Sequence, residues 1–173
     1  MSGTIKIAVL NDYQHVAESL ANWRSLEPAA TTLFFHDNIS DIDQLARRLE
    51  PFAVLALIRE RTRLGADLIA RLPNLKLVVT IGMKNAAIDL AAAKAHNVIV
   101  TGTEGMEEFE RTPVLTWTLI LALTRNLYHE AASVRAGGWQ VGSGFDIAGK
   151  TLALLCLGRI GQEVARYGTV FKS

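Results

Sequence analysis

Short apolar runs alternate with amphipathic segments along the first hundred residues of the chain. The runs are rich in β-branched residues and read IKIAVL (5–10), TTLFF (31–35), AVLALI (53–58), LKLVVT (75–80) and NVIV (97–100). The segments between them have the spacing of helices with one apolar face: HVAESLANWRSL (15–26), DIDQLARRL (41–49), GADLIARL (65–72) and IDLAAAKAH (88–96). Continuous apolar strands separated by helices are typical of a parallel sheet covered on both faces. The pattern therefore predicts an α/β fold with a doubly wound parallel sheet.

After residue 101 the pattern changes to a polar connection followed by one long apolar segment. The connection, TGTEGMEEFERTP (101–113), ends in a proline that suits the first turn of a helix. The segment VLTWTLILALTRNLYHEAASVRA (114–136) is long enough for about six helical turns, and Gly137 and Gly138 end it. Its first half is apolar around most of the helix, which is more than one core face requires. We therefore expect Trp117 to be buried against a partner subunit rather than within one chain.

A predicted strand, a glycine-containing turn and a helix follow one another in the last part of the sequence. The strand TLALLCL (151–157) leads into the turn Cys156-Leu157-Gly158-Arg159-Ile160-Gly161. The dinucleotide fingerprint G-x-G-x-x-G uses its glycines for a tight turn, for close approach to the pyrophosphate and for helix–strand packing. Two of the three are present, and Cys156 occupies the first position, where a side chain crowds the phosphate or strains the turn. By itself this turn fits a nucleotide site and an ordinary packing turn equally well.

Several stretches, taken in order, resemble the D-isomer-specific 2-hydroxyacid dehydrogenases, which include the phosphoglycerate dehydrogenase-like enzymes. They are IAVLNDYQ (7–14), LIRERT (57–62), VVTIGMKNAAIDLAAAKAHNVIVTGT (78–103), RTPVLTWTLILALTRN (111–126) and IAGKTLALLCLGRIGQEVA (147–165). The resemblance covers nearly the whole chain but only about the first half of a family member. It implies a flavodoxin-like substrate domain over 1–101, lacking its C-terminal return helix. It also implies the start of an NAD-binding Rossmann domain over 102–173, including the dimerisation arm.

The resemblance also implies which residues bind ligands. Backbone N–H groups of the loop after the fourth strand hold the substrate carboxylate in this family, and the cofactor is NAD. The substrate-binding residues that the resemblance implies are Gly82, Met83 and Lys84, where Lys84 replaces the second glycine of the family's G-x-G loop pattern. Arg59 is a further substrate-binding candidate by its position, because Arg59 and Arg61 follow the third predicted strand, where a guanidinium can bind a carboxylate or phosphate through two hydrogen bonds. The cofactor-binding residues implied are Gly158, Arg159, Ile160 and Gly161. The alternatives are an ordinary strand-to-helix turn at Gly82 and a solvated charge pair of Arg59 or Arg61 with Glu60.

The family's catalytic arginine, glutamate and histidine lie in later sequence, so we expect no catalytic residue in this chain. The chain is then the N-terminal portion of an NAD-dependent D-2-hydroxyacid dehydrogenase acting on a small 2-hydroxy or 2-keto acid, inactive by itself. Whether it is an enzyme therefore stays open. The alternative is a non-enzymatic flavodoxin-like module that binds an anion and dimerises. In either case we expect a homodimer through the 112–136 helix and a possible strand swap by 151–157.

Charge and composition argue against several classes of binding partner. The formal net charge is +1 with both signs mixed along the chain, which argues against a nucleic-acid surface. The one cysteine excludes an internal disulfide, and no signal peptide or bilayer-length apolar run is visible, so we expect a cytoplasmic protein without membrane contact. No residue spacing suggests a metal site. None of the histidines has an acid nearby in sequence at the spacing of a catalytic relay: His15, His36, His96 and His129.

Overall fold

The computed structural model describes residues 4–104 and 111–171. It divides into two compact units, Met1–Gly105 and Met106–Ser173.

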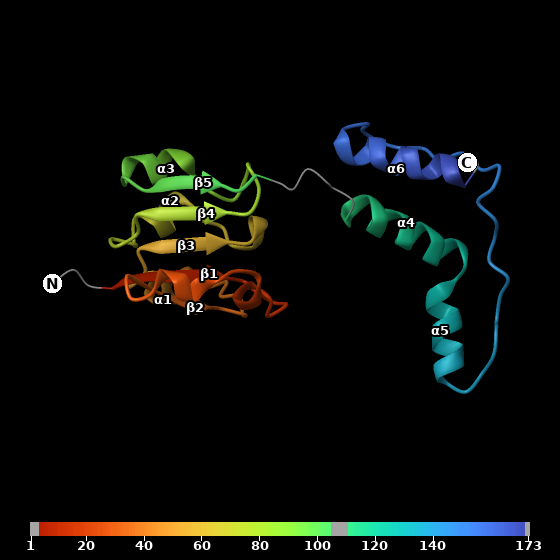
Figure 1. The fold of residues 1–173 in the computed structure, drawn as a ribbon, viewed down its shortest axis with the longest axis horizontal. Coiled ribbons are helices and arrows are strands. Elements are labelled where there is room, and N and C mark those ends of the chain that lie inside the picture. Colours follow the sequence, from red (N-terminus) through yellow and green to blue (C-terminus); the bar gives the residue numbers. More distant parts are fainter. Residues whose placement is uncertain (1–3, 105–110, 172–173) are drawn as a thin grey trace. The chain divides into compact units, whose positions relative to one another are not determined.

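The first unit is built on a sheet of parallel strands (Figure 1). The strands are β1 (Ile5–Leu10), β2 (Ala30–Phe34), β3 (Val54–Leu57), β4 (Leu77–Thr80) and β5 (Ile99–Gly102). Their order across the sheet is β2-β1-β3-β4-β5, and every neighbouring pair is parallel. This is the flavodoxin-like strand order, in which the chain first builds outward from β1 on one side and then on the other. The predicted fold class, a doubly wound parallel α/β sheet, is confirmed.

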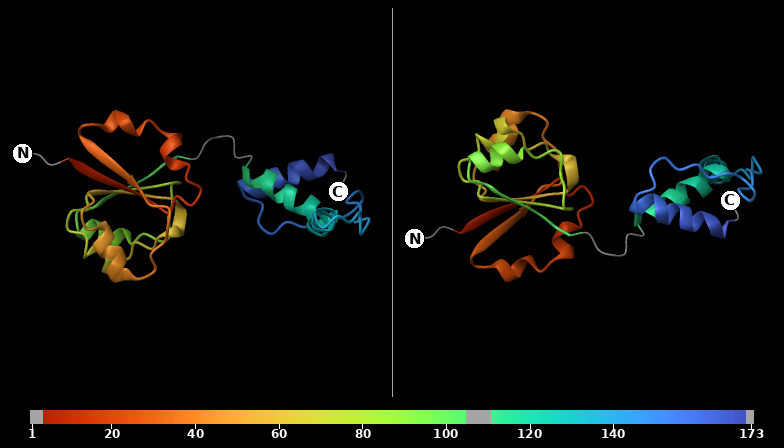
Figure 2. Two further views of the ribbon diagram at one scale, coloured as in Figure 1. Left: turned by 90° about the horizontal axis from the view of Figure 1, so that it is seen from below. Right: turned by 90° about the horizontal axis from the view of Figure 1, so that it is seen from above.

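Helical segments cover both faces of this sheet (Figure 2). One face packs against the helices α1 (Ile42–Leu49), α2 (Ala66–Ile69) and α3 (Leu90–Ala95). The strands present alternate residues to these helices, since side chains of a strand point to opposite faces in turn. Ala8, Leu55 and Val78 lie side by side in the middle of this core and are fully buried.

The other face carries two short 3-10 helices, η1 (Ala17–Leu20) and η2 (Trp23–Leu26), where an amphipathic helix was predicted. Side-chain hydrogen bonds hold this segment. The buried carboxylate of Asp12 accepts from the N–H groups of Val16 and Ala17 at 3.1 and 3.0 Å, and the indole of Trp23 donates to the carbonyl of Ala17 at 2.8 Å. The ring of Trp23 meets Phe34 of β2 edge-on.

The second unit consists of α4 (Arg111–Thr124), α5 (Leu127–Arg135), α6 (Arg159–Val170) and the connections between them. The single helix predicted over 112–136 is in fact two helices. The break lies at Asn126, whose φ of 52° is left-handed, a conformation that asparagine tolerates better than most residues. The carbonyl of Thr124 just before the break accepts from the N–H of Phe145 at 2.8 Å. That bond ties the end of α4 to the segment that follows α5.

Helix α6 covers part of α4, which corrects the expectation for Trp117. The indole of Trp117 is buried within its own chain and donates to the backbone oxygen of Val164 at 2.9 Å. Its ring stacks on Phe171 with 4.7 Å between ring centroids. The expectation that this residue needs a partner subunit for burial was wrong, because one amphipathic helix from later in the sequence is enough to cover it.

The predicted strand over 151–157 has no regular secondary structure and forms no sheet pairing in the described part of the second unit. Leu155 is 97% exposed and Leu157 is 62% exposed. No helix of the described residues is long and apolar enough to cross a membrane.

Candidate functional site

Polar residues gather where the parallel strands end. Asn11 follows β1, Arg59 lies just after β3, Gly82 follows β4 and Thr103 follows β5. The carboxyl ends of parallel strands meet at one edge of the sheet, where doubly wound folds bind their ligands. Because the hydrogen bonds below connect these loops, they form one site within the first unit.

The structure brings together two of the predicted substrate-binding residues, Arg59 and Gly82. Nη1 of Arg59 lies 3.0 Å from the position that a Cβ on Gly82 would occupy. Gly82 has a φ of 93°, a backbone conformation that favours glycine. The guanidinium of Arg59 has no hydrogen-bond or ion-pair partner among the described residues. It is therefore available to an anionic ligand.

The backbone N–H groups of the same loop are not equivalent. The N–H of Gly82 donates to Oγ1 of Thr103 at 3.0 Å, so it is already engaged. The N–H groups of Met83 and Lys84 have no acceptor among the described residues. Both side chains are exposed. The donors open to a carboxylate are thus one and two residues later than Gly82.

The guanidinium of Arg61, in contrast, is already hydrogen-bonded to the loop after β1. Its Nη1 donates to the backbone oxygen of Asn11 at 2.7 Å and to the side chain of Gln14 at 3.3 Å. Its guanidinium also lies over the ring of Tyr13, 4.9 Å from the centroid. No ion pair joins either arginine of this segment to Glu60 in the part of the chain that the structure describes. The solvated charge pair considered from the sequence is therefore not formed.

Sequence reasoning missed the buried polar residues that support this edge of the sheet. The hydroxyl of Thr62 donates to the side-chain oxygen of Asn11, and both residues are buried. The signal that could have found them is the dipeptide Asn11-Asp12 directly after an apolar strand, since polar residues at that point face the ligand edge.

The fold brings one of the histidines close to an acid that is distant in sequence. Nδ1 of His36 lies 3.6 Å from the carboxylate of Asp12 and 2.9 Å from its backbone oxygen. The rings of His15 and His36 stack with centroids 3.8 Å apart. His36 therefore does have an acid beside it. The pairing was invisible in the sequence because 24 positions separate the two residues.

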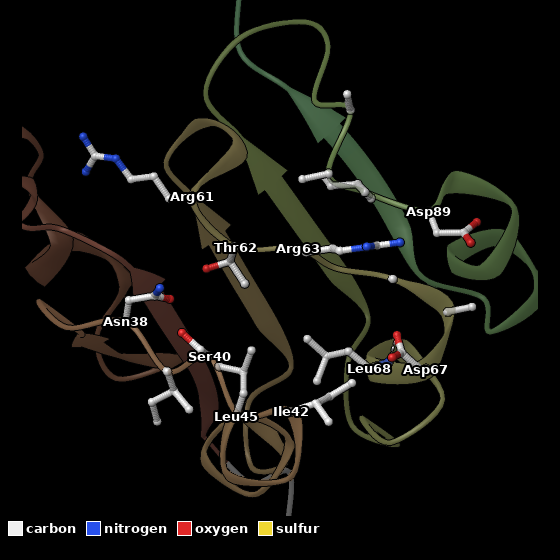
Figure 3. Close-up of a pocket in the computed structure, with 16 residues that line it drawn as sticks. Asn38, Ser40, Ile42, Leu45, Arg61, Thr62, Arg63, Asp67, Leu68 and Asp89 are labelled. Carbon is white, nitrogen blue, oxygen red and sulfur yellow. Dashed lines mark hydrogen bonds between the residues drawn. The ribbon is translucent and has the colours of Figure 1, made fainter.

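A cavity in the first unit lies apart from the predicted substrate loop (Figure 3). It has a volume of about 790 Å³ and is bounded by the start of α1, the start of α2 and the segment before α3. Its polar lining includes Ser40, Thr62, Arg63, Asp67 and Asp89. Figure 3 shows the side chain of Arg61 directed away from the others. Since the lining includes neither Arg59 nor Gly82, this cavity is not the predicted carboxylate site.

In the second unit, the turn at 156–161 shows one feature for each glycine position of the dinucleotide fingerprint. Cys156 has a φ of 72°, the left-handed conformation that normally calls for glycine. Gly158 caps α6, and a Cβ there would meet no atom within 4 Å. A Cβ on Gly161 would lie 2.4 Å from the backbone oxygen of Cys156, so this glycine allows close packing.

These residues fit the phosphates of a dinucleotide. The hollow beside the turn measures about 510 Å³ and is bordered by Cys156, Gly158, Arg159, Ile160 and Gly161. The open side of Gly158 lets a ligand approach the backbone, and the first turn of a helix offers N–H groups to an anion.

For metals the result is different: the described residues contain no group of three or more histidine, cysteine or acidic side chains that could hold an ion.

Two family descriptions match the chain and together cover most of it. The catalytic domain of D-isomer specific 2-hydroxyacid dehydrogenases matches residues 7–110, and the NAD binding domain of the same enzymes matches residues 117–173. Residues that match a catalytic domain are thus followed by residues that match an NAD binding domain of the same class of proteins. The chain belongs to the D-isomer specific 2-hydroxyacid dehydrogenase family, whose cofactor is NAD.

Individual relatives agree with this assignment. The chain is 32% identical over 136 residues to glyoxylate reductase of Aeropyrum pernix, an alignment that covers 73% of this chain and 40% of that protein. It is 30% identical over 131 residues to D-3-phosphoglycerate dehydrogenase of Methanocaldococcus jannaschii, which covers 75% of this chain and 25% of that protein. Among solved structures, phosphoglycerate oxidoreductase from Vibrio cholerae o395 has a TM-score of 0.88 and 39% identity, covering 97% of this chain and 54% of the other. The chain therefore spans about half the length of that structure and less of the two sequence relatives.

Proposed function

We propose that this chain supplies the substrate-carboxylate loop and the first part of the NAD site of a D-2-hydroxyacid dehydrogenase. Such an enzyme transfers a hydride between nicotinamide and C2 of a 2-hydroxy or 2-keto acid. The observation that carries the proposal is the position of the unpaired Arg59 guanidinium beside Gly82, 3.0 Å from where a Cβ on that glycine would lie, at the ligand edge of a sheet whose sequence matches the family's catalytic domain. The alternative, a non-enzymatic anion-binding and dimerisation module, is not favoured, because the NAD binding domain matches as well.

In this proposal the first unit binds the substrate by its carboxylate. The guanidinium of Arg59 and the N–H groups of Met83 and Lys84 donate to the carboxylate oxygens. The ammonium of Lys84 adds positive charge to an exposed part of the same loop. Holding the carboxylate in this way orients C2 of the substrate, and correct orientation is one of the larger contributions to enzymatic rates.

The second unit contributes to the NAD site. Gly158, Arg159, Ile160 and Gly161 hold the pyrophosphate at the start of α6, where the helix dipole favours negative charge. When bound, NAD supplies the group that accepts or donates the hydride. This chain's own part is to fix the phosphates and so the position of the cofactor relative to the substrate.

The organisation of the chain follows from the same proposal. Residues 1–101 are the substrate domain, and residues 102–173 are the start of the NAD-binding domain with its dimerisation arm. Exposed leucines of α4 and the exposed segment 151–157 support an assembly with a second copy, through 112–136 and by exchange or packing of 151–157.

The test is an assay of NADH oxidation with glyoxylate and with hydroxypyruvate. We expect no turnover from the 173-residue chain alone, because the family's proton-transfer groups belong to the half of the relatives that this chain does not match. We expect turnover when residues 1–173 replace the matching half of the Vibrio cholerae phosphoglycerate oxidoreductase.

In that hybrid, Arg59→Gln is expected to lower kcat/KM by roughly tenfold to hundredfold, the effect of losing a charge-assisted hydrogen bond of about 1.5–3 kcal/mol. Arg63→Gln, an exposed arginine of the same segment, is the control and is expected to leave kcat/KM unchanged. A folded hybrid that binds NADH but reduces neither acid contradicts the proposal.

A further inference from the structure

Asn85 makes three hydrogen bonds that join separate parts of the substrate loop. Its side-chain nitrogen donates to the backbone oxygen of Arg59 and to Oγ1 of Thr80, both at 2.8 Å. Its side-chain oxygen accepts from the N–H of Ala87 at 2.9 Å. Both N–H donors of the amide are therefore used. The corner after β3, the end of β4 and the segment before α3 are held together by this one residue.

The backbone of Arg59 needs a stabilising interaction, because it is left-handed with a φ of 56°. For a residue other than glycine, this conformation costs about 1–2 kcal/mol. The carbonyl that accepts from Asn85 belongs to Arg59 itself, so the hydrogen bond acts at the strained residue. The same conformation accompanies the position of the guanidinium beside Gly82.

The loop is fixed on its other side by β5 and the residue after it. Thr103 accepts from the N–H of Gly82, and a Cβ on Gly102 would lie 2.5 Å from the carbonyl oxygen of Gly82. The loop thus lies directly on the end of β5. Its next two N–H groups, those of Met83 and Lys84, are left for a ligand.

We infer that Asn85 is a positioning residue that holds Arg59 beside Gly82. In this arrangement the guanidinium and the N–H groups of Met83 and Lys84 form one binding site for a carboxylate. The identity of the anion rests on the proposed function. The positioning rests on the hydrogen bonds alone. Asn85 does not bind the anion itself, because both of its N–H donors are engaged within the protein.

The test uses NMR on the 173-residue chain with oxamate, a non-reacting 2-keto acid analogue, as the probe. Oxamate is expected to shift the amide signals of Met83 and Lys84 in a saturable manner. Asn85→Ala is expected to weaken its binding at least tenfold. The matched control is Asn74→Ala, because Asn74 also donates to a loop carbonyl, that of Glu50 at 2.9 Å, but lies outside this site. The control is expected to keep the wild-type Kd.

A measurement without ligand separates the inference from the proposed function. The HN–Hα coupling and Cα shift of Arg59 report its left-handed backbone, and we expect Asn85→Ala, but not Asn74→Ala, to change them. If the wild-type chain does not bind oxamate, the proposed carboxylate loop is wrong, and the Arg59 signals still decide the positioning. Unchanged Arg59 signals in Asn85→Ala overturn the inference, as does an equal loss of binding in Asn74→Ala.

Asn85→Asp provides a second variant should the alanine variant fail to fold. It keeps the acceptor for the N–H of Ala87 and removes the amide donors that reach Arg59 and Thr80. It is expected to change the Arg59 signals and weaken oxamate binding in the same direction.

Discussion

The carboxylate of Asp37 is held by both terminal nitrogens of Arg48, with Nη1 at 2.6 Å and Nη2 at 2.9 Å. Hydrogen bonding to Arg48 is the main reason that the pKa of Asp37 is lowered from its ordinary value of 3.8. A carboxyl group whose pKa is lower in the folded than in the unfolded state stabilises the fold above the unfolded pKa. That contribution is lost as the pH falls through the folded pKa.

We therefore expect Arg48→Met to reduce the free energy of unfolding at neutral pH by about 0.5 kcal/mol, the size usual for an exposed ion pair. The difference from wild type is expected to shrink as the pH falls below the usual pKa of Asp37, because the protonated carboxyl no longer gains from the charge of Arg48. Urea unfolding at a series of pH values measures this. Arg47→Met, an exposed arginine of the same helix with no ion pair among the described residues, should show no such trend.

Individual site residues were only partly predictable from the sequence. Arg59 was a candidate by its place after a strand and Gly82 by the family resemblance, and the structure places the Arg59 guanidinium beside Gly82. The engagement of the Gly82 N–H by Thr103 was not predictable, because it depends on how closely β5 approaches the loop. The pairing of His36 with Asp12 was hidden for a similar reason, since it depends on the pairing of β1 with β2.

At the level of elements, α4 and α6 depend on each other through Trp117. Truncating a buried aromatic side chain costs about 3–5 kcal/mol. We expect Trp117→Ala to unfold or strongly destabilise the second unit. Trp117→Phe, which keeps the ring but loses the hydrogen bond to Val164, should cost about 1 kcal/mol.

Chemical denaturation followed by far-UV circular dichroism measures both effects. Trp139→Ala is the control, because the side chain of Trp139 is 82% exposed and its removal is expected to be nearly neutral. Equal stability of Trp117→Ala and Trp139→Ala would contradict the role assigned to this contact.

Elements were predicted well where periodicity alone determines them. All the strands of the sheet were expected from short apolar runs, because a strand buried on both faces needs nothing else to be recognised. The break at Asn126 was missed because it lies inside a continuous helical pattern. It accompanies a hydrogen bond between Thr124 and Phe145, residues 21 positions apart, which no local pattern reveals.

For the molecule as a whole, an exposed apolar row on α4 bears on assembly. Leu115, Leu119 and Leu123 recur at every fourth position and are 56%, 55% and 75% exposed. Residues at this spacing lie on one side of a helix. The row supports the proposed contact with a second copy of the chain.

We expect the wild-type chain to be a dimer in dilute solution and the double variant Leu119→Glu, Leu123→Glu to be a monomer, because two buried carboxylates oppose the association. Light scattering after size-exclusion chromatography measures the mass of each. Leu20→Glu, on the first unit, changes an equally exposed leucine and should leave the mass unchanged. A monomeric wild-type chain would refute the proposed assembly.

The division into a first and a second unit was foreseeable from the change in pattern after residue 101, whereas the exact domain limits remain a prediction. The missing sheet pairing of 151–157 could not be read from the residues, because an apolar run has the same appearance whether or not a neighbouring strand is present.

The position of the sheet in the sequence also determines when it can form during synthesis of the chain. Every strand of the sheet lies within the first 102 residues, and none of the later residues that the structure describes is inserted between them. On a ribosome that adds about 5–20 residues per second, the rest of this chain takes on the order of several seconds to synthesise. The sheet and the loop that carries Arg59 and Gly82 are therefore complete in sequence while the second unit is still being made. The proposed carboxylate site can therefore form before the residues of the proposed cofactor site have been synthesised.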